Sequence, residues 1–214
     1  MTLEITGIII VLLAGAMFGG AYLGERKKLR RKWEAVIGMG FTFSRKVPPD
    51  FVRKLGAFQL LNGSGIAPIR DVLFRSEEDR NIAVFTLNYY REGTRSVIEP
   101  GDLNVFFADV EGLDLPYFRL VLKTLQKRVQ NVSDIEFSDY PDFSEYFLLS
   151  GAPGAPERKI RTLFTPRLID FIESHGIREM EGWQTRLILI SHVDIIELIE
   201  RGEELIEIIR SAAG

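Results

Sequence analysis

Residues 5–23 read ITGIIIVLLAGAMFGGAYL, a run of 19 residues without a charged side chain. As an α-helix this run is about 28 Å long, close to the roughly 30 Å hydrocarbon core of a bilayer. Nine of its residues are Leu, Ile, Val or Phe, and together they favour insertion by about 3–5 kcal/mol. The run predicts a single transmembrane helix over residues 5–23.

Six basic residues follow this run within seven positions, whereas residues 1–4 contain none. They are Arg26, Lys27, Lys28, Arg30, Arg31 and Lys32. Loops rich in Lys and Arg stay on the cytoplasmic side. We therefore expect a protein of the cell (inner) membrane, with its N-terminus outside and everything after Gly24 in the cytoplasm. A cleaved signal peptide, the alternative, requires a basic segment before the apolar run.

Two features of this region have more than one interpretation. Gly15 and Gly19 form a GxxxG pair on one helix face, which either supports helix dimerisation or reflects the high frequency of Gly in membrane helices. The basic residues either set topology alone or also contact anionic lipid head groups. Trp33 is then an interfacial anchor or the first core residue of the next helix.

The overall composition excludes several classes of protein. Among 214 residues there is no cysteine, which rules out a disulfide scaffold, a thiolate metal site and a cysteine nucleophile. The two histidines, His175 and His192, are too few to favour a histidine metal site. The formal charge is −3, and because residues 1–32 hold two acids and six bases, residues 33–214 carry −7. This sign opposes binding of a phosphate backbone, so we expect no nucleic-acid partner.

The remainder of the chain predicts an α+β domain. A basic juxtamembrane segment and short helix occupy residues 24–46, and the soluble domain spans 47–214. Residues 82–90 form the clearest strand, with apolar side chains on both faces, as in a strand buried on both sides. Further strands are expected at 69–75, 94–98, 104–110, 134–137 and 146–149, with a hairpin over 179–190, while 118–129 is ambiguous between strand and helix. The sheet should be mainly antiparallel and covered by C-terminal helices near 157–175 and 193–211.

Several stretches resemble a family of uncharacterised bacterial membrane-anchored proteins. They are LGAFQLLNGSGIAPIRDVLF at 55–74, AVFTLNYY at 83–90, DIEF at 134–137, PDFSEYFLLSG at 141–151 and LFTPRLIDFIESH at 163–175. In that family a transmembrane helix and a basic stretch precede a domain of this layout. The matching motifs are aromatic and apolar, so the resemblance implies architecture and location, with no assigned activity.

One cluster has the residue types needed for chemistry. Acids alternate with aromatic residues at Asp134, Glu136, Asp139, Asp142 and Glu145. They suit either a carboxylate pair for acid–base catalysis or oxygen ligands for a cation. The alternative is a purely structural role, in which the aromatic side chains of a turn-rich segment enter the core and its acidic side chains stay in water. Neither a phosphate-binding loop nor a nucleophile motif is present, so we predict no catalytic residue, cofactor or metal.

Three functions fit these observations. The first is a non-enzymatic, membrane-tethered interaction or adaptor module with the lipid bilayer and a protein, or a second copy of itself, as partners; it predicts an exposed apolar or aromatic patch. The second is a ligand- or lipid-sensing domain with a pocket of roughly 300 Å³ or more, lined by residues such as Phe85, Phe106 and Phe147. The third is a carboxylate-based hydrolase, which needs two acids in one cleft. The first is favoured because no catalytic signature accompanies the strong anchor.

Overall fold

The computed structural model describes residues 34–44, 47–62, 69–87, 103–123, 133–153 and 156–213. Its contacts divide the chain into two units, residues 1–41 and residues 42–214. In the first unit, residues 34–38 are helical and the chain turns at Gly40, which has a φ of 85°. The predicted transmembrane helix, Gly15 and Gly19, and the interfacial residues from Arg26 to Trp33 lie outside the described residues. Within the ranges given above, no helix has both the length and the apolarity of a membrane span.

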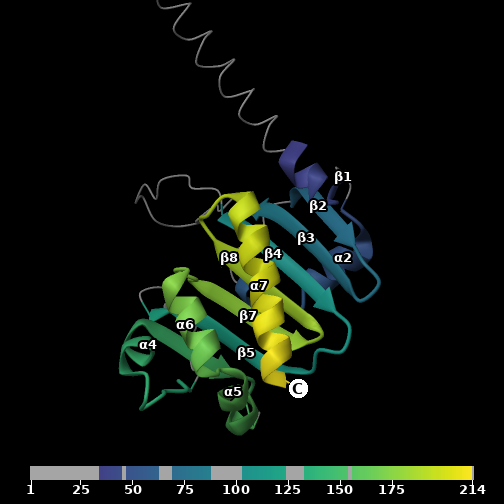
Figure 1. Cartoon of the computed structure of the whole chain (residues 1–214). Coiled ribbons are helices and arrows are strands. Elements are labelled where there is room, and N and C mark those ends of the chain that lie inside the picture. The colour runs from purple at the N-terminus through teal and green to yellow at the C-terminus, as the bar shows by residue number, and fades with distance from the viewer. Residues whose placement is uncertain are drawn as a thin grey trace, which may run out of the picture. The chain divides into compact units, whose positions relative to one another are not determined.

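An antiparallel sheet of eight strands organises the described part of the second unit (Figure 1). The strands are β1 (Thr42–Ser44), β2 (Arg70–Ser76), β3 (Arg80–Leu87), β4 (Leu103–Val110), β5 (Leu115–Leu122), β6 (Phe147–Gly151), β7 (Glu179–Gln184) and β8 (Arg186–Ser191). Their order is β1-β2-β3-β4-β8-β7-β5-β6, and every neighbouring pair is antiparallel. The α+β class and the mainly antiparallel sheet are therefore confirmed.

Strands β4 and β5 are consecutive in the chain but are not neighbours in the sheet. The β7–β8 hairpin lies between them, and residues 111–114 pass its turn. The backbone N–H of Val110 donates to the carbonyl of Thr185 at 2.8 Å, which attaches this connection to the hairpin. Gly112 bends the connection with a φ of 82°, a left-handed conformation that suits glycine.

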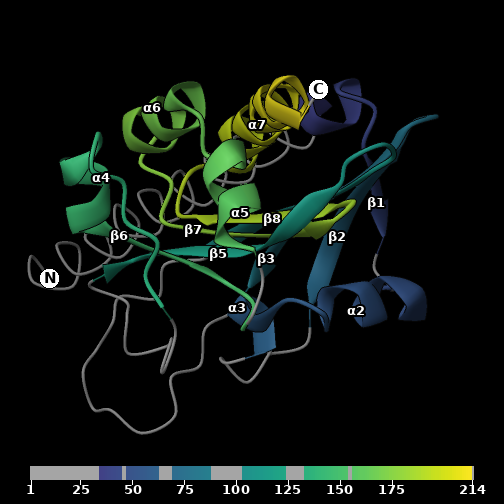
Figure 2. The same cartoon turned by 90° about the horizontal axis from the view of Figure 1, so that it is seen from below.

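Helices cover both faces of the sheet (Figure 2). On one face lie α2 (Pro49–Leu55) and α3 (Gln59–Asn62); on the other lie α5 (Glu157–Leu163), α6 (Pro166–Ser174) and α7 (Ile195–Ala213). A further short helix, α4 (Pro141–Tyr146), directly precedes β6. The expected C-terminal helices are confirmed, and Thr165 caps α6 by accepting the N–H of Leu168 at 3.4 Å. The outer acids of α7 are partly used within the domain, since Glu203 pairs with Arg75 and Glu207 with Arg80.

The α7 side of the sheet is apolar across its whole width. One row of laterally paired residues runs through all eight strands: Phe43, Leu73, Val84, Phe106, Leu189, Met180, Leu120 and Leu149. Helix α7 approaches this row closely at Gly202, where an added Cβ would lie 2.5 Å from the ring of Phe106. A glycine at this position therefore sets how tightly α7 packs on β4.

The opposite side changes character halfway across. Its corresponding row begins with Phe74, Ala83, Phe107 and Ile188, and continues with Glu181, Arg119 and Ser150. The apolar half packs against α2 and α3 in a core that includes Phe51, Leu55 and Phe58. The polar half is buried as well, with Glu181 fully inaccessible. Both candidate sites lie on this side.

Several sequence predictions need correction. Residues 134–137 form no strand, because Ile135 makes a single backbone bond to Leu149 within a loop. The segment 146–149 is preceded by α4 and forms β6 only from Phe147. The ambiguous segment at 118–129 contributes Phe118–Leu122 to β5. The strand predicted at 82–90 spans Arg80–Leu87 and is buried on both faces as expected; 94–98 lies outside the described residues.

Candidate functional site

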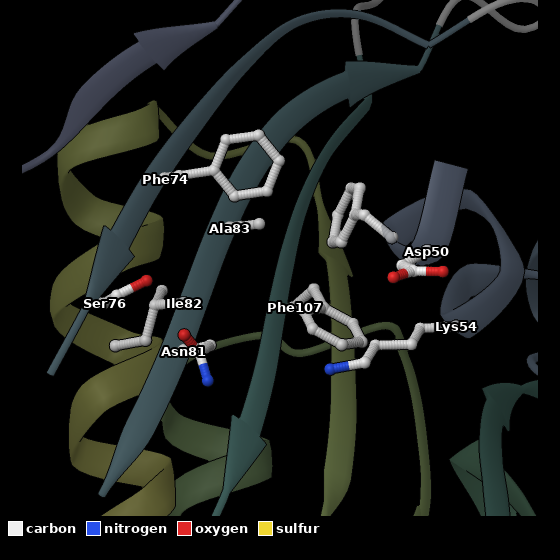
Figure 3. Close-up of a pocket in the computed structure, with 9 residues that line it drawn as sticks. Asp50, Lys54, Phe74, Ser76, Asn81, Ile82, Ala83 and Phe107 are labelled. Atoms are coloured by element: carbon white, nitrogen blue, oxygen red, sulfur yellow. The ribbon is translucent and has the colours of Figure 1, made fainter. Parts of the chain in front are cut away.

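A pocket of about 150 Å³ opens between α2 and the sheet (Figure 3). Residues from α2 and from strands β2, β3 and β4 line it: Asp50, Phe51, Lys54, Phe74, Ser76, Asn81, Ile82, Ala83 and Phe107. Phe74, Ala83 and Phe107 are lateral neighbours on one face of the sheet, opposite Asp50 and Lys54 of the helix. The floor of the pocket is therefore apolar and its rim is polar.

Phenylalanine rings hold α2 on the sheet and form the walls of this pocket. Phe51 and Leu55 are one helical turn apart, so both face the sheet. The Phe51 ring packs edge-to-face on Phe74 at 5.0 Å and on Phe107 at 5.2 Å, measured between ring centroids. This arrangement suits the charge distribution of aromatic rings and fixes the position of α2 above the pocket.

The charges at the pocket mouth are largely neutralised. Lys54 Nζ lies 2.6 Å from Asp109 Oδ2, and Asp109 also accepts a 2.6 Å bond from the Thr185 hydroxyl. Burial alone raises the pKa of Asp109, but the hydrogen bonds from Lys54 and Thr185 outweigh it and hold that pKa below its usual value. Asp50 pairs with Arg53 at 3.1 Å. The mouth therefore offers no net charge to an incoming group.

A second cluster lies on the polar half of the same sheet face, beneath α3. The Glu181 carboxylate accepts the backbone N–H of Gln59 at 2.9 Å and of Leu60 at 2.8 Å. Arg119 donates to Gln59 Oε1 at 2.8 Å. These bonds join β7 and β5 to the first turn of α3, which needs acceptors for its free N–H groups. The immediate role of Glu181 is thus to attach α3 to the sheet.

Burial dominates the ionisation of this cluster. Removal from water raises the pKa of Glu181, although the bonds from Leu60 and Gln59 and the nearby Tyr117 and Arg119 oppose the shift. Burial also raises the pKa of Tyr117, and the Glu181 carboxylate raises it further. Sequence reasoning placed Glu181 only in a hairpin. The available signal was strand alternation, which puts Glu179 and Glu181 on one face of the strand and Met180 and Gly182 on the other.

The acidic segment singled out in the sequence is spread over the surface. Asp134 is paired with Lys123 at 2.8 Å and accepts the N–H of Leu149 at 3.2 Å. A broad depression of about 760 Å³ brings Asp134, Glu136 and Glu145 together with Lys123 and Arg161, whereas Asp139 and Asp142 are exposed outside it. In the part of the chain that the structure describes, no group of three potential ligands can hold a metal ion.

The three phenylalanines proposed to line a ligand pocket do not share one. Phe85 packs on Phe51 on the α2 side of the sheet, while Phe106 contacts α7 on the opposite side. Phe147 stacks on Phe143 of α4 at 5.1 Å. These three residues therefore do not line one pocket, because register puts Phe85 and Phe106 on opposite faces of neighbouring strands.

The two histidines lie in separate places. His175 follows α6, stacks on Phe171 at 4.2 Å between ring centroids, and its Nδ1 lies 3.0 Å from the Phe171 carbonyl. His192 is exposed between β8 and α7.

Comparison of the chain with protein-family models, with curated proteins and with solved structures finds no match. The resemblance to bacterial membrane-anchored proteins stays a prediction. The function proposed below therefore rests on the geometry of this chain.

Proposed function

We propose that the protein is a membrane-tethered interaction module that binds a partner protein by accepting one uncharged apolar side chain in the α2 pocket. The observation that carries this proposal is the pocket itself, with its phenylalanine walls and its neutral rim. Among the described residues of the second unit, the most exposed large apolar side chains lie on four different elements: Phe43, Val52, Tyr146 and Trp183. The pocket brings the aromatic side chains of Phe51, Phe74 and Phe107 together, whereas these four exposed residues form no shared aromatic surface on one element.

The size of the pocket favours a side chain over a lipid. Pockets for drug-sized ligands and cofactors measure roughly 300–1,000 Å³, whereas an apolar cavity of about 150 Å³ is large enough for benzene. The α2 pocket, at about 150 Å³, matches a Phe or Leu side chain. A lipid-sensing role is correspondingly disfavoured for this site.

The charges around the pocket favour an uncharged group. Lys54 disfavours a cation and Asp50 disfavours an anion at the rim, and each already has a partner of opposite charge. Burying an unpaired charge beside Phe51, Phe74 and Phe107 is costly, whereas burying an apolar group is favourable. A partner segment with an aromatic or aliphatic anchor fits best.

The tether adds to this function. The apolar run at 5–23 and the basic residues after it support a place on the cytoplasmic face of the cell membrane. Confinement to the membrane raises the effective concentration of the module for partners in the same membrane, so one small pocket suffices for useful binding.

Site-specific photo-crosslinking of the full chain in its native membrane tests the proposal. We expect p-benzoylphenylalanine at Asn81, an exposed residue on the pocket rim, to form a discrete protein adduct. The same group at Glu204, an exposed residue of α7, is the matched control and should not form that adduct. An adduct at twice the mass of the chain identifies a second copy as the partner. No adduct at Asn81, or identical adducts at both positions, contradicts the proposal.

A blocking variant makes the test specific to the pocket. Ala83 is buried and lines the pocket between Phe74 and Phe107, so Ala83→Leu puts additional carbons into the space proposed for the partner. The crosslink from Asn81 should disappear in this variant while the level of folded protein is retained. A crosslink that persists unchanged means that the partner binds elsewhere.

A further inference from the structure

The two helices over the pocket side of the sheet are attached by different groups. Helix α2, whose buried Phe51 and Leu55 pack on the sheet, is also attached through the Lys54–Asp109 ion pair, whose Nζ–Oδ2 distance is 2.6 Å. Helix α3 is attached through Glu181, which accepts the N–H groups of Gln59 and Leu60 at 2.9 and 2.8 Å. The residues between the two helices are Gly56, Ala57 and Phe58.

These attachments differ in their exposure to water. Glu181 is completely buried, whereas 35% of the Lys54 side chain is exposed. Water competes for a partly exposed ion pair, so the Lys54–Asp109 pair opens more readily than the buried bonds between α3 and Glu181. A helix of seven residues does not persist alone, so α2 depends on its contacts with the sheet.

Lys54 also lines the pocket, close to Phe107 (Figure 3). Lys54 therefore connects the rim of the pocket to Asp109 of β4. Gly56 ends α2 in a helical conformation, with φ −61° and ψ −14°, and as a glycine it can also adopt backbone conformations that other residues avoid.

We infer that α2 is a lid over the pocket, latched by the Lys54–Asp109 ion pair and hinged at Gly56–Phe58, while α3 stays attached to Glu181. Opening of the lid admits the apolar side chain, and closing packs Phe51 against it. The nature of the occupant rests on the proposed function, whereas the lid movement does not.

Hydrogen exchange of the purified full chain, followed by mass spectrometry, tests the lid without a partner. In Lys54→Met, which keeps an apolar side chain but loses the charge, exchange over residues 49–56 should accelerate about three- to tenfold, as expected for a partly exposed charged pair. Exchange over residues 59–62 should not change. Arg53→Met is the matched control, because Arg53 pairs only with Asp50 in its own helix among the described contacts and should leave both segments unchanged.

A second variant tests the hinge. An alanine Cβ at Gly56 would have its nearest neighbour at 3.5 Å, so Gly56→Ala fits and restricts the backbone. Exchange over 49–56 should then be slower in Gly56→Ala than in the wild-type chain. N-acetyl-phenylalaninamide at millimolar concentration should also slow exchange over 49–56 in the wild-type chain. The lid is refuted if Lys54→Met exchanges like Arg53→Met, or if 49–56 and 59–62 accelerate together. Normal lid behaviour without a crosslink at Asn81 would instead reject the proposed function.

Discussion

Replacement of Glu181 by alanine gives the most direct measure of how α3 is held. The change removes the acceptor for the N–H groups of Gln59 and Leu60 and leaves both without their present partner. An unsatisfied buried donor costs roughly 1–3 kcal/mol, while removal of a buried carboxylate whose burial raises its pKa returns part of that cost. We expect a net loss of about 2–4 kcal/mol in the free energy of unfolding.

The dependence on pH follows from the direction of the shift. The pKa of Glu181 in the folded protein lies above its ordinary value of 4.5, so the native state binds more protons than the unfolded state between these two values. The contribution of Glu181 to stability therefore grows as the pH falls through its folded pKa toward 4.5. Glu181→Gln keeps one acceptor but cannot be protonated, and it should lose less stability than Glu181→Ala.

Urea unfolding of the three proteins at about pH 8 and at about pH 4.5, the ordinary pKa of a glutamate, measures both effects. The stability gap between wild type and Glu181→Gln should widen at the lower pH. Glu204→Ala, an exposed acid on α7, is the control and should stay within about 0.5 kcal/mol of wild type at both values. If Glu181→Ala also falls within that range, Glu181 does not hold α3. A gap that is independent of pH would mean that Glu181 is ionised as readily as in the unfolded chain.

Three other predictions concern packing, a turn and topology. Gly202→Ala should lower the free energy of unfolding by about 1–3 kcal/mol despite the better helix propensity of alanine, because its Cβ would lie 2.5 Å from the buried Phe106 ring. Thermal unfolding measures this loss. An unchanged melting midpoint would show that α7 shifts freely. Gln184→Gly should raise the free energy of unfolding by about 0.5–1 kcal/mol, because Gln184 has a φ of 57° in the β7–β8 turn, a left-handed conformation that strains a residue with a side chain. A lower melting midpoint would contradict this strain. A tag after Gly214 should survive protease added to intact cells and be digested after lysis, whereas digestion in intact cells would reverse the proposed orientation.

Local patterns predicted most elements of the fold. Alternation predicted the strand at 82–90, which the structure describes as β3 up to Leu87, and the hairpin over 179–190. The Thr165–Pro166 cap located the start of α6. These signals act within a few residues, so they survive folding. Strand order is not local: the short 111–114 connection favours a β4–β5 hairpin, but β7 and β8 pair between the two strands.

The candidate sites were harder to predict, because they depend on which face of each strand is buried and on which other element covers that face. A residue pair such as Phe85 and Phe106 looks equivalent in the sequence, yet register places the two rings on opposite faces. Glu181 looks like a surface acid until α3, about 120 residues earlier in the chain, supplies its N–H groups. The composition of the acidic segment at 134–145 suited catalysis or cation binding, but the acidic residues of this segment are mostly exposed.

The position of the β7–β8 hairpin has a consequence for biosynthesis. The β4 and β5 edges receive their partners only after residues 179–191 have left the ribosome, so about five-sixths of the chain is made before the sheet can close. Until then both edges offer open backbone to other nascent chains. A stop codon before Glu179 should therefore yield an aggregation-prone product rather than a smaller folded domain. The chain thus tolerates loss of its last sixth poorly, even though that sixth contributes only two strands and one helix.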